Sequence, residues 1–421
     1  MSTSLSIRES IGKITADKII ALTILVSALG YFVDIFDLLL FSIVRVQSLK
    51  DIGIAPADLL AVGIRLLNTQ MAGLLIGGFF WGVIGDKYGR VSVLMASILL
   101  YSIGNIANGF AQTIDQYAAL RFITGLGLAG ELGCGVTLAS ELLPKNLRGL
   151  GAAFISFIGI LGAVLAYYIA HTLGWREAYI AGGIMGLILL ALRARVKESG
   201  LYHAMEKQEA RTKRGNMLLF FKKPELLRKY ILVILMGAPI WAVVGIFITF
   251  SPEFAREFGM KTLPDAGLAV LFCYGLQAFA GLLISLISQK LRSRKKAILL
   301  SIVLLIITTG LFVTVRTDSL PVFYSLCAIT GFGCAYWPMF VQVGAEQFGT
   351  NIRATAAVSI PNVVRGLVIP MTMGFRALIP SLGVAGSGVT VMGVMVVLAL
   401  LSLWRLKETF HVDLDYIEGE V

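Results

Sequence analysis

The chain has 421 residues, of which 57% are hydrophobic and 14% are charged, and its formal net charge is +11 at pH 7. A soluble domain does not need so much apolar surface, and a mean hydropathy of +0.84 is typical of a protein that crosses a membrane many times. The basic balance does not indicate a nucleic-acid partner, because Lys and Arg gather in alternate loops between apolar segments.

Twelve apolar segments are long enough to cross a bilayer, which takes about 20 residues per helix. All should be helices, since an isolated strand leaves its backbone polar groups unsatisfied in lipid. The even number places both termini on one side, and the bias of Lys and Arg between loops makes that side the cytoplasm. We therefore predict an all-α, multi-pass protein of the cell membrane, with spans at 20–46, 58–84, 91–111, 116–139, 149–172, 176–192, 230–251, 266–289, 297–315, 320–343, 354–377 and 384–404.

The first span carries two carboxylates near its middle, Asp34 and Asp37. A spacing of three residues places both on one face of a helix. Two acids so close repel each other, and burial further disfavours their charged forms, so one of them is suited to carry a proton. The alternative is a structural role in which both are permanently paired with arginines.

The loop after the second span reads Gly-Val-Ile-Gly-Asp-Lys-Tyr-Gly-Arg from position 82, and its charges place it at a bilayer surface. An ordinary tight loop between two helices is the alternative. The pattern resembles the loop signature of the major facilitator superfamily, Gly-x-x-x-Asp-x-x-Gly-Arg, at every position. The resemblance implies two six-helix bundles that alternate access to a central site, with Asp86 and Arg90 among the gating residues.

The fourth span carries Arg121 in Arg-Phe-Ile-Thr-Gly-Leu-Gly, which resembles the second signature of the superfamily. The arginine of that signature is associated with proton coupling, which implies that Arg121 acts on Asp37 or Asp34. Arg65 of the second span is expected at a similar depth and competes for the same acids. Glu131 resembles an acid in the transport path of the metabolite:proton symporter and sugar-transporter-like branches, and a hydrogen bond to a neighbouring helix is the alternative role.

The second half of the chain repeats short motifs of the first half. The segment Ile-Thr-Gly-Leu-Gly at 123–127 returns as Ile-Thr-Gly-Phe-Gly at 329–333, and an acid and an arginine follow each copy, namely Glu141, Arg148, Glu346 and Arg353. The repeat predicts two parallel six-helix bundles at 1–192 and 230–421, joined by a cytoplasmic linker at 193–229. By resemblance to the sugar-porter-like branch, these acids and arginines form a charge network that closes the inner gate.

Arg365 lies at the centre of the eleventh span and is the only mid-membrane cation predicted for the second half. A buried arginine without a partner is costly, and an anionic substrate would neutralise it. We expect Arg365 and Asn362, one turn away, to hold a substrate carboxylate; a salt bridge across the halves to Asp34 or Asp37 is the alternative. The other residues expected to line the substrate site are polar or aromatic, namely Tyr31, Gln70, Trp241, Gln277, Trp337 and Gln342.

Together these features favour a monomeric secondary transporter that couples the inward movement of a small organic anion to protons. Proton-driven efflux of a drug or siderophore is the second hypothesis, weakened because Gly-Ile-Leu-Gly-Ala-Val in the fifth span lacks proline, and a non-transporting sensor is the third. Besides substrate and protons, the expected partner is membrane lipid, which the basic loop at 288–294 should contact. We expect no cofactor, metal or enzymatic activity, since the chain lacks a nucleotide-binding glycine loop, a catalytic His or Cys constellation and cysteines at metal-ligand spacing.

Overall fold

The computed structural model describes residues 2–88, 90–131, 148–198, 223–410 and 412, and every regular element in this part of the chain is helical. The first half contains α1 (Ser2–Asp51), α2 (Leu59–Tyr88), α3 (Arg90–Asn108), α4 (Ile114–Leu128), α6 (Arg148–Leu173) and α7 (Trp175–Glu198). The second half contains α10 (Pro224–Ala242), the π-helix η1 (Val243–Ile248), α11 (Ser251–Glu257), α12 (Ala266–Leu291), α13 (Arg294–Thr314), α14 (Leu320–Gly333), the 3₁₀-helix η2 (Cys334–Tyr336), α15 (Trp337–Glu346), α16 (Thr350–Gly366) and α17 (Val368–Arg405). The expected linker falls mostly outside the described residues, so its bounds stay a prediction.

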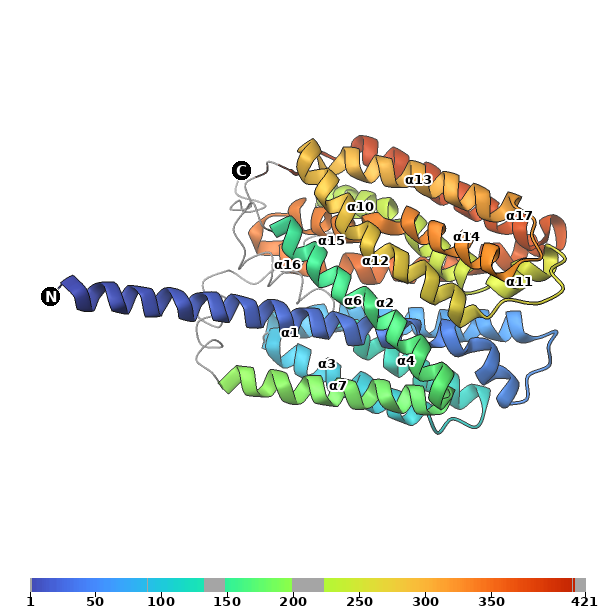
Figure 1. Ribbon diagram of the computed structural model, residues 1–421, viewed down its shortest axis with the longest axis horizontal. Coiled ribbons are helices and arrows are strands. Elements are labelled where there is room, and N and C mark those ends of the chain that lie inside the picture. Colours follow the sequence, from blue (N-terminus) through green and yellow to red (C-terminus); the bar gives the residue numbers. More distant parts are fainter. Residues whose placement is uncertain (1, 89, 132–147, 199–222, 411, 413–421) are drawn as a thin grey trace.

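The described helices provide twelve membrane crossings, which agrees with the number expected from the sequence. Among the described residues, nine segments are long and apolar enough to span a bilayer, and α3 is a shorter apolar helix. One of the nine, Thr355–Arg405, has 51 residues and crosses twice, because the chain breaks at Gly383 with a left-handed φ of 70°. α4 supplies the remaining crossing. Figure 1 shows that α1 begins and α17 finishes at one end of the bundle, here named the terminal end, whereas α1 finishes at Asp51 at the opposite end.

The repeated glycine segments give α4 and α14 equivalent places in the two halves. Gly125 of α4 lies against the backbone of α2, and Gly127 lies against the backbone of α3. In the same way, Gly331 of α14 lies against α12 and Gly333 against α13. A Cβ atom at any of these four positions would overlap the neighbouring backbone, so glycine permits the close helix approach. The duplication read from the sequence is therefore also a duplication of helix packing.

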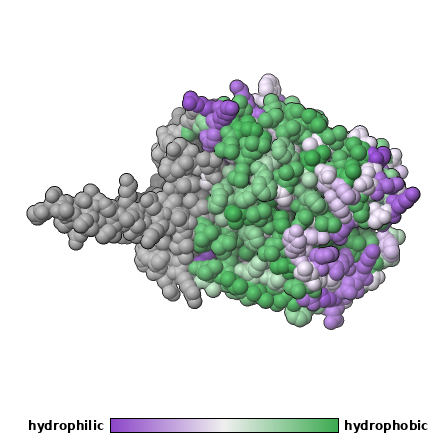
Figure 2. Space-filling model, in the orientation of Figure 1, coloured by the Kyte–Doolittle hydropathy of each residue, from purple (hydrophilic) through white to green (hydrophobic). Residues whose placement is uncertain are grey.

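The outer surface of the bundle is apolar, as lipid contact requires. Figure 2 shows a broad hydrophobic band over one face of the molecule, with hydrophilic residues gathered at the opposite end. Many large apolar side chains are exposed, among them Ile76, Phe110, Ile188, Phe279 and Trp404. A soluble monomer rarely exposes so much apolar surface.

The two halves meet along helices from each repeat. α1, α2 and α6 of the first half pack against α12, α16 and α17 of the second. Buried polar side chains from both halves lie along this interface, and they form the candidate site described next.

Candidate substrate and proton site

Arg365 and Asp34 form a buried ion pair between the two halves. The Nη2 atom of Arg365 in α16 lies 3.1 Å from Oδ2 of Asp34 in α1, and both side chains are 0% exposed. This is the cross-half salt bridge that the sequence left as one of two alternatives. The Nε and Nη1 atoms of Arg365 and Oδ1 of Asp34 have no hydrogen-bond partner among the described residues. Buried polar atoms without partners are uncommon and often mark places that bind water or a ligand.

Irregularities in three helices bring side chains to this interface. Arg365 is the penultimate residue of α16, one turn after Pro361, and α17 starts after a single intervening residue. α15 begins at Trp337 directly after the 3₁₀ turn of η2. α10 contains Pro239 and passes into the π-helix η1. Proline and π-turns interrupt the regular backbone hydrogen bonds of a helix, and such interruptions are frequent at functional sites.

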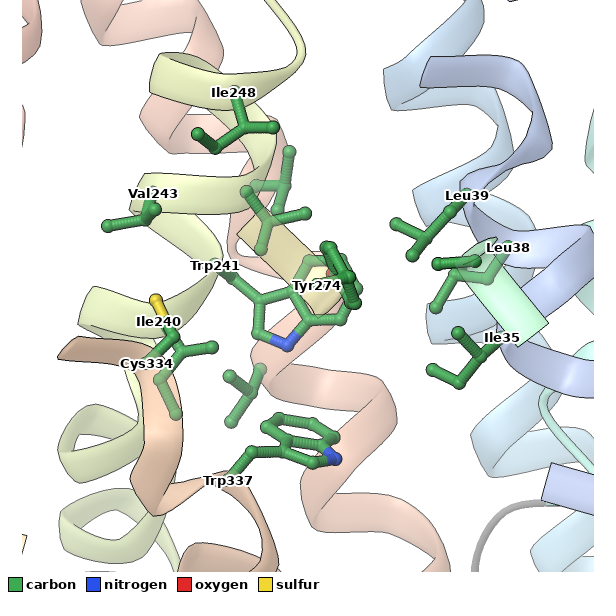
Figure 3. Close-up of a cluster of buried hydrophobic side chains, with 14 of the residues drawn as sticks. Ile35, Leu38, Leu39, Ile240, Trp241, Val243, Ile248, Tyr274, Cys334 and Trp337 are labelled. Carbon is green, nitrogen blue, oxygen red and sulfur yellow. The ribbon is translucent and has the colours of Figure 1, made fainter. Parts of the chain in front are cut away.

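Two indole rings flank the Arg365 guanidinium. Its Cζ atom lies 5.6 Å from the ring centroid of Trp241 and 6.0 Å from that of Trp337, within the range of cation–π attraction. Nε1 of Trp337 donates a 2.6 Å hydrogen bond to the hydroxyl of Tyr31, whereas Nε1 of Trp241 has no acceptor among the described residues. Figure 3 shows an aromatic wall of Trp241, Tyr274 and Trp337 facing an aliphatic wall on α1 made of Ile35, Leu38 and Leu39.

A second polar cluster is buried within the first half. Arg121 of α4 donates a hydrogen bond from Nη2 to Oε1 of Gln70 in α2, and its Cζ atom lies 5.1 Å from the ring centroid of Phe41. Asp37 is buried and interacts electrostatically with Arg121 and Asp34. Neither Asp37 oxygen has a hydrogen-bond partner among the described residues, and the same holds for Nε and Nη1 of Arg121. The direct partner of Arg121 is thus Gln70, and its effect on Asp37 acts through space.

Glu131 is paired with a cation that was expected to lie in the linker. Its Oε1 atom lies 2.8 Å from Nη2 of Arg193 in α7, and the two side chains are 2% and 12% exposed. The pair packs on Gly30 of α1, where a Cβ atom would overlap both side chains. Sequence reasoning missed Arg193 because the sixth span was expected to end at 192, whereas α7 continues to Glu198.

The remaining residues expected at the substrate site lie in different places. Asn362 donates a 2.8 Å hydrogen bond across the halves to the carbonyl oxygen of Ala129. Gln277 donates to the carbonyl oxygen of Cys334 at 3.3 Å. Gln342 is directed toward the terminal end, where its amide donates to Glu346 at 2.6 Å. Asn362 therefore lies at the interface, whereas Gln277 and Gln342 bond within the second half.

The expectation for Arg65 is wrong. Its side chain is 58% exposed and pairs with Asp115 at 2.7 Å. α2 begins at Leu59, so Arg65 lies only about 9 Å from the start of that helix at a rise of 1.5 Å per residue. This position is near the opposite end of the bundle, and Arg65 does not compete for the buried acids of α1.

Glu346 is the only expected gating residue whose side chain falls within the described residues. Nη2 of Arg294 lies 3.6 Å from Glu346 Oε1, and the Arg294 side chain is 6% exposed. Arg294 therefore bonds within the second half, and the expectation that the 288–294 loop contacts lipid headgroups stays a prediction for the other basic residues of the loop. The side chains of Asp86, Arg90, Arg148 and Arg353, and Glu141 as a whole, lie outside the described residues, so their gating roles stay predictions.

Glu408, beyond the last helix, caps the start of α13. Its Oε1 atom accepts a 2.9 Å hydrogen bond from the backbone N–H of Arg294, and Oε2 accepts from the N–H of Lys295 at 3.2 Å and from the hydroxyl of Ser293 at 2.5 Å. Partial burial by itself would raise the pKa of Glu408, but these hydrogen bonds outweigh it and hold the pKa below its ordinary value.

A second ion pair joins the two halves at the opposite end, and sequence reasoning missed it. Nη1 and Nη2 of Arg45 in α1 each lie 2.8 Å from one oxygen of Glu253 in α11, and the side chains are 0% and 10% exposed. Arg45 lies at the edge of the first expected span, which was given as 20–46, whereas α1 continues to Asp51 and buries it.

Known transporters resemble this chain over most of its length. It is 26% identical over 406 residues to a probable 4-methylmuconolactone transporter of Cupriavidus pinatubonensis, covering 92% of this chain and 90% of the relative. It is 29% identical over 381 residues to a sialic acid transporter of Escherichia coli, with coverage of 86% and 89%. A cis,cis-muconate transport protein of Acinetobacter baylyi is 28% identical over 393 residues, with coverage of 87% and 89%.

The fold and the family agree with these relatives. The solved structure of the proton:xylose symporter XylE matches with a TM-score of 0.71 at 20% identity, over 95% of this chain and 98% of that one. A family model described as the Major Facilitator Superfamily matches residues 21–373, which includes helices of both halves. The chain is therefore a multi-pass membrane transporter rather than an enzyme, and it belongs to the Major Facilitator Superfamily.

Proposed function

We propose that this transporter carries a small organic anion together with protons by alternating access, as a monomer with both termini in the cytoplasm. The bias of Lys and Arg between loops supports this orientation. The observation that carries the substrate class is Arg365, a fully buried cation between the halves whose Nε and Nη1 atoms have no partner among the described residues. An arginine in this state offers charge-assisted hydrogen bonds to a carboxylate.

The Arg365–Asp34 pair gives a physical reason for coupling to protons. Without substrate, the charges of the pair cancel. A substrate carboxylate on Arg365 leaves one negative charge in excess, and burial of an uncompensated charge costs several kcal/mol. A proton on Asp34 removes that excess, so anion and proton bind better together than either binds alone. In the transporter without substrate, the Asp34 carboxylate thus occupies the position beside Arg365 that the substrate carboxylate would take.

Three buried carboxylates support a route for the proton along the first half. Asp37 lies one turn from Asp34 toward the opposite end, and Glu131 interacts electrostatically with both. Arg121, held by Gln70, keeps a positive charge near Asp37. A proton that enters from the opposite end meets Asp37, then Asp34, and then the Glu131–Arg193 pair.

The walls beside Arg365 support a substrate with a flat, partly apolar body. One wall contains Trp241, Trp337 and Tyr274, and the other consists of aliphatic side chains of α1 (Figure 3). Indole rings offer both a flat apolar face and a polar N–H group. The relatives named above for methylmuconolactone, muconate and sialic acid indicate carboxylic acids as the first candidates.

Uptake into proteoliposomes tests the proposal. Vesicles that contain the purified protein are given an inward proton gradient and radiolabelled cis,cis-muconate or sialic acid, with xylose as the uncharged control. We expect accumulation of an acid above its external concentration, and its loss when a protonophore collapses the gradient. Release of preloaded acid in response to an inward proton gradient would indicate efflux instead.

Arg365→Lys is the sharpest variant for the substrate role. Lysine keeps the charge but loses the planar fork, so we expect the apparent affinity for the anion to fall about 10- to 100-fold, as the loss of a charged hydrogen bond predicts. Arg365→Ala should abolish uptake. Arg65→Lys, at an exposed ion pair near the opposite end, is the matched control and should leave uptake unchanged. An unchanged affinity in both Arg365 variants would remove Arg365 from the substrate site.

A further inference from the structure

The interior of the first half contains a row of buried polar side chains on α3. Tyr101, Ser102 and Asn105, here named the α3 row, are three or four residues apart and therefore lie on one face of the helix. All three side chains are 0% exposed. α3 packs against α4 and α7 of its own half. Polar groups are thus buried among the helices of the first bundle, where packing alone would favour apolar side chains.

The α3 row lies beside two acids of the proton route proposed above. Asn105 interacts with Asp37, and Tyr101 interacts electrostatically with both Asp37 and Glu131. Glu131 packs on Gly30 of α1, and Asp37 lies two turns further along that helix, about 10 Å at a rise of 1.5 Å per residue. One hydrogen bond covers only about 3 Å, so a proton needs intermediate groups to pass between these two levels of α1.

One face of α7 follows the α3 row from one acid to the other. A Cβ atom at Gly182 would overlap Oδ1 of Asp37, and a Cβ atom at Gly186, one turn later, would overlap Oγ of Ser102. Arg193, seven residues further on, pairs with the second acid. Spacings of four and seven residues keep these three positions of α7 on one face. Glycine therefore lets the polar atoms lie directly against the backbone of α7.

Polar atoms along this path have no hydrogen-bond partner among the described residues. They are both amide atoms of Asn105, the hydroxyls of Tyr101 and Ser102, both carboxylate oxygens of Asp37, Oε2 of Glu131 and Nη1 of Arg193. Unpaired polar groups are costly to bury, and so many in one region of a protein require a partner. Water suits this set, because the groups include both donors and acceptors and a buried water bonds about three of them.

We propose that a chain of bound waters lies along the α3 row and carries protons between the acids of α1 and Glu131. This inference rests on the proton-coupled function proposed above and adds a path inside the first half. Tyr101, Ser102 and Asn105 are positioning residues that hold the waters. Each water accepts one proton and donates another, so the acid of α1 becomes a carboxylate, Glu131 becomes protonated and the waters are regenerated.

The position of the chain suits a transporter whose halves move. Every group along the path belongs to α1, α3, α7 or the end of α4, all in the first half. Contacts within one half persist when the halves move against each other, so the relay stays assembled throughout the cycle. Arg365 belongs to the second half, which lets proton transfer and anion binding be altered separately.

Radiolytic labelling tests for the waters in the unmodified protein without substrate. Brief X-ray irradiation converts bound water into hydroxyl radicals, which modify the nearest side chain and are located by mass spectrometry. We expect Tyr101 to be labelled. Tyr336 is the matched control, because it is equally buried in the second half and donates to the carbonyl oxygen of Met236. Equal labelling of the two tyrosines would overturn the water chain.

Transport by two near-isosteric variants tests the relay. Tyr101→Phe and Asn105→Leu remove polar atoms and change the side-chain volume little. Counterflow of the anion at equal pH needs no net proton transfer, so we expect it to stay within about twofold of the parent. Uptake driven by a proton gradient should slow at least about tenfold. Tyr336→Phe, which also removes a buried hydroxyl, should leave both rates unchanged.

The outcomes separate this inference from the function on which it rests. Gradient-driven uptake at the parent rate in both variants, or an equal loss in both assays, would contradict the relay. Size-exclusion chromatography identifies a variant that does not fold, and the labelling of Tyr101 then decides, since it needs no variant. A parent protein that accumulates the anion while Tyr101 stays unlabelled keeps the proposed transport and removes the water chain. A labelled Tyr101 in a parent that accumulates no anion removes the transport proposal and the relay with it.

Discussion

At the scale of single residues, Asp34 forms a buried ion pair with Arg365. We expect Asp34→Asn to separate binding of the substrate anion from its coupling to protons. Asparagine resembles a protonated aspartate, so the variant should still bind the anion and exchange it across the membrane. It should no longer accumulate the anion in response to a proton gradient, because no carboxylate remains to release the proton. Counterflow and gradient-driven uptake, measured on the same vesicles, check both halves of this expectation. Proton-driven accumulation at the parent level would move the coupling role to Asp37 or Glu131.

The sequence identified the ions of this site but could not assign their partners. The costs of burying Asp34, Asp37, Arg121 and Arg365 in hydrocarbon were enough to mark them. Which ions pair depends on how the two bundles are rotated against each other. The sequence places each helix along the membrane normal only to within a few residues, so it does not determine that rotation. For the same reason the sequence did not identify Arg193 and Arg45 as partners. Arg193 lies just past the expected end of the sixth span, and Arg45 lies near the expected end of the first.

At the scale of helices, Gly331 tests the close contact between α14 and α12. A Cβ atom there would overlap the backbone of Cys273, which cannot move aside as a side chain can. We expect Gly331→Ala to destabilise the protein by about 1–3 kcal/mol, the usual range for overpacking. Gly310→Ala on α13 is the control, because a methyl group at that position would have no neighbouring atom within 4 Å. Melting temperatures in detergent compare the two, and equal values would contradict the close packing.

Glu408 gives the cap of α13 a predictable pH dependence. Because hydrogen bonds hold its pKa in the folded protein below the ordinary value of 4.5, its contribution to stability is fully present above about pH 4.5. That contribution disappears as the pH falls through the folded-state pKa. We therefore expect the parent to melt at a higher temperature than Glu408→Gln at pH 6, and the difference to shrink on acidification below pH 4.5. A difference that is constant between pH 6 and pH 3.5 would show that the carboxylate charge does not matter.

Helix positions were predicted well from apolar length, whereas the irregularities inside helices were not. The break at Gly383 falls in the gap expected between the last two spans. The π-helix η1 and the 3₁₀ turn η2 lie inside continuous apolar stretches, where neither hydropathy nor length signals a change of backbone geometry. Those irregular turns border Trp241 and Trp337, so the part of the site hardest to predict is the part that the backbone shapes most.

At the scale of the whole molecule, the described contacts join the two halves at the opposite end, so that end is closed. Arg45–Glu253 and Ser42–Thr249 hold the halves together there, and Arg365–Asp34 joins them deeper in the bundle. The duplicated sequence predicted two parallel halves. It did not predict which end is closed, because one sequence encodes every state of the cycle and the states differ in contacts of small net free energy.

The π-helix at Val243–Ile248 has a mechanical consequence for the chain beyond it. Its wide turn, closed by the 3.2 Å bond from the N–H of Thr249 to the carbonyl of Val244, accommodates one residue more than an α-helical turn. Deleting one residue from it would restore regular winding and leave the chain beyond it at about the same angle, because the wide turn absorbs the extra residue within one revolution. Such a shortened protein should still point Glu253 toward Arg45, whereas deleting one residue from the regular part of α10 should rotate Glu253 by about 100° around the helix axis.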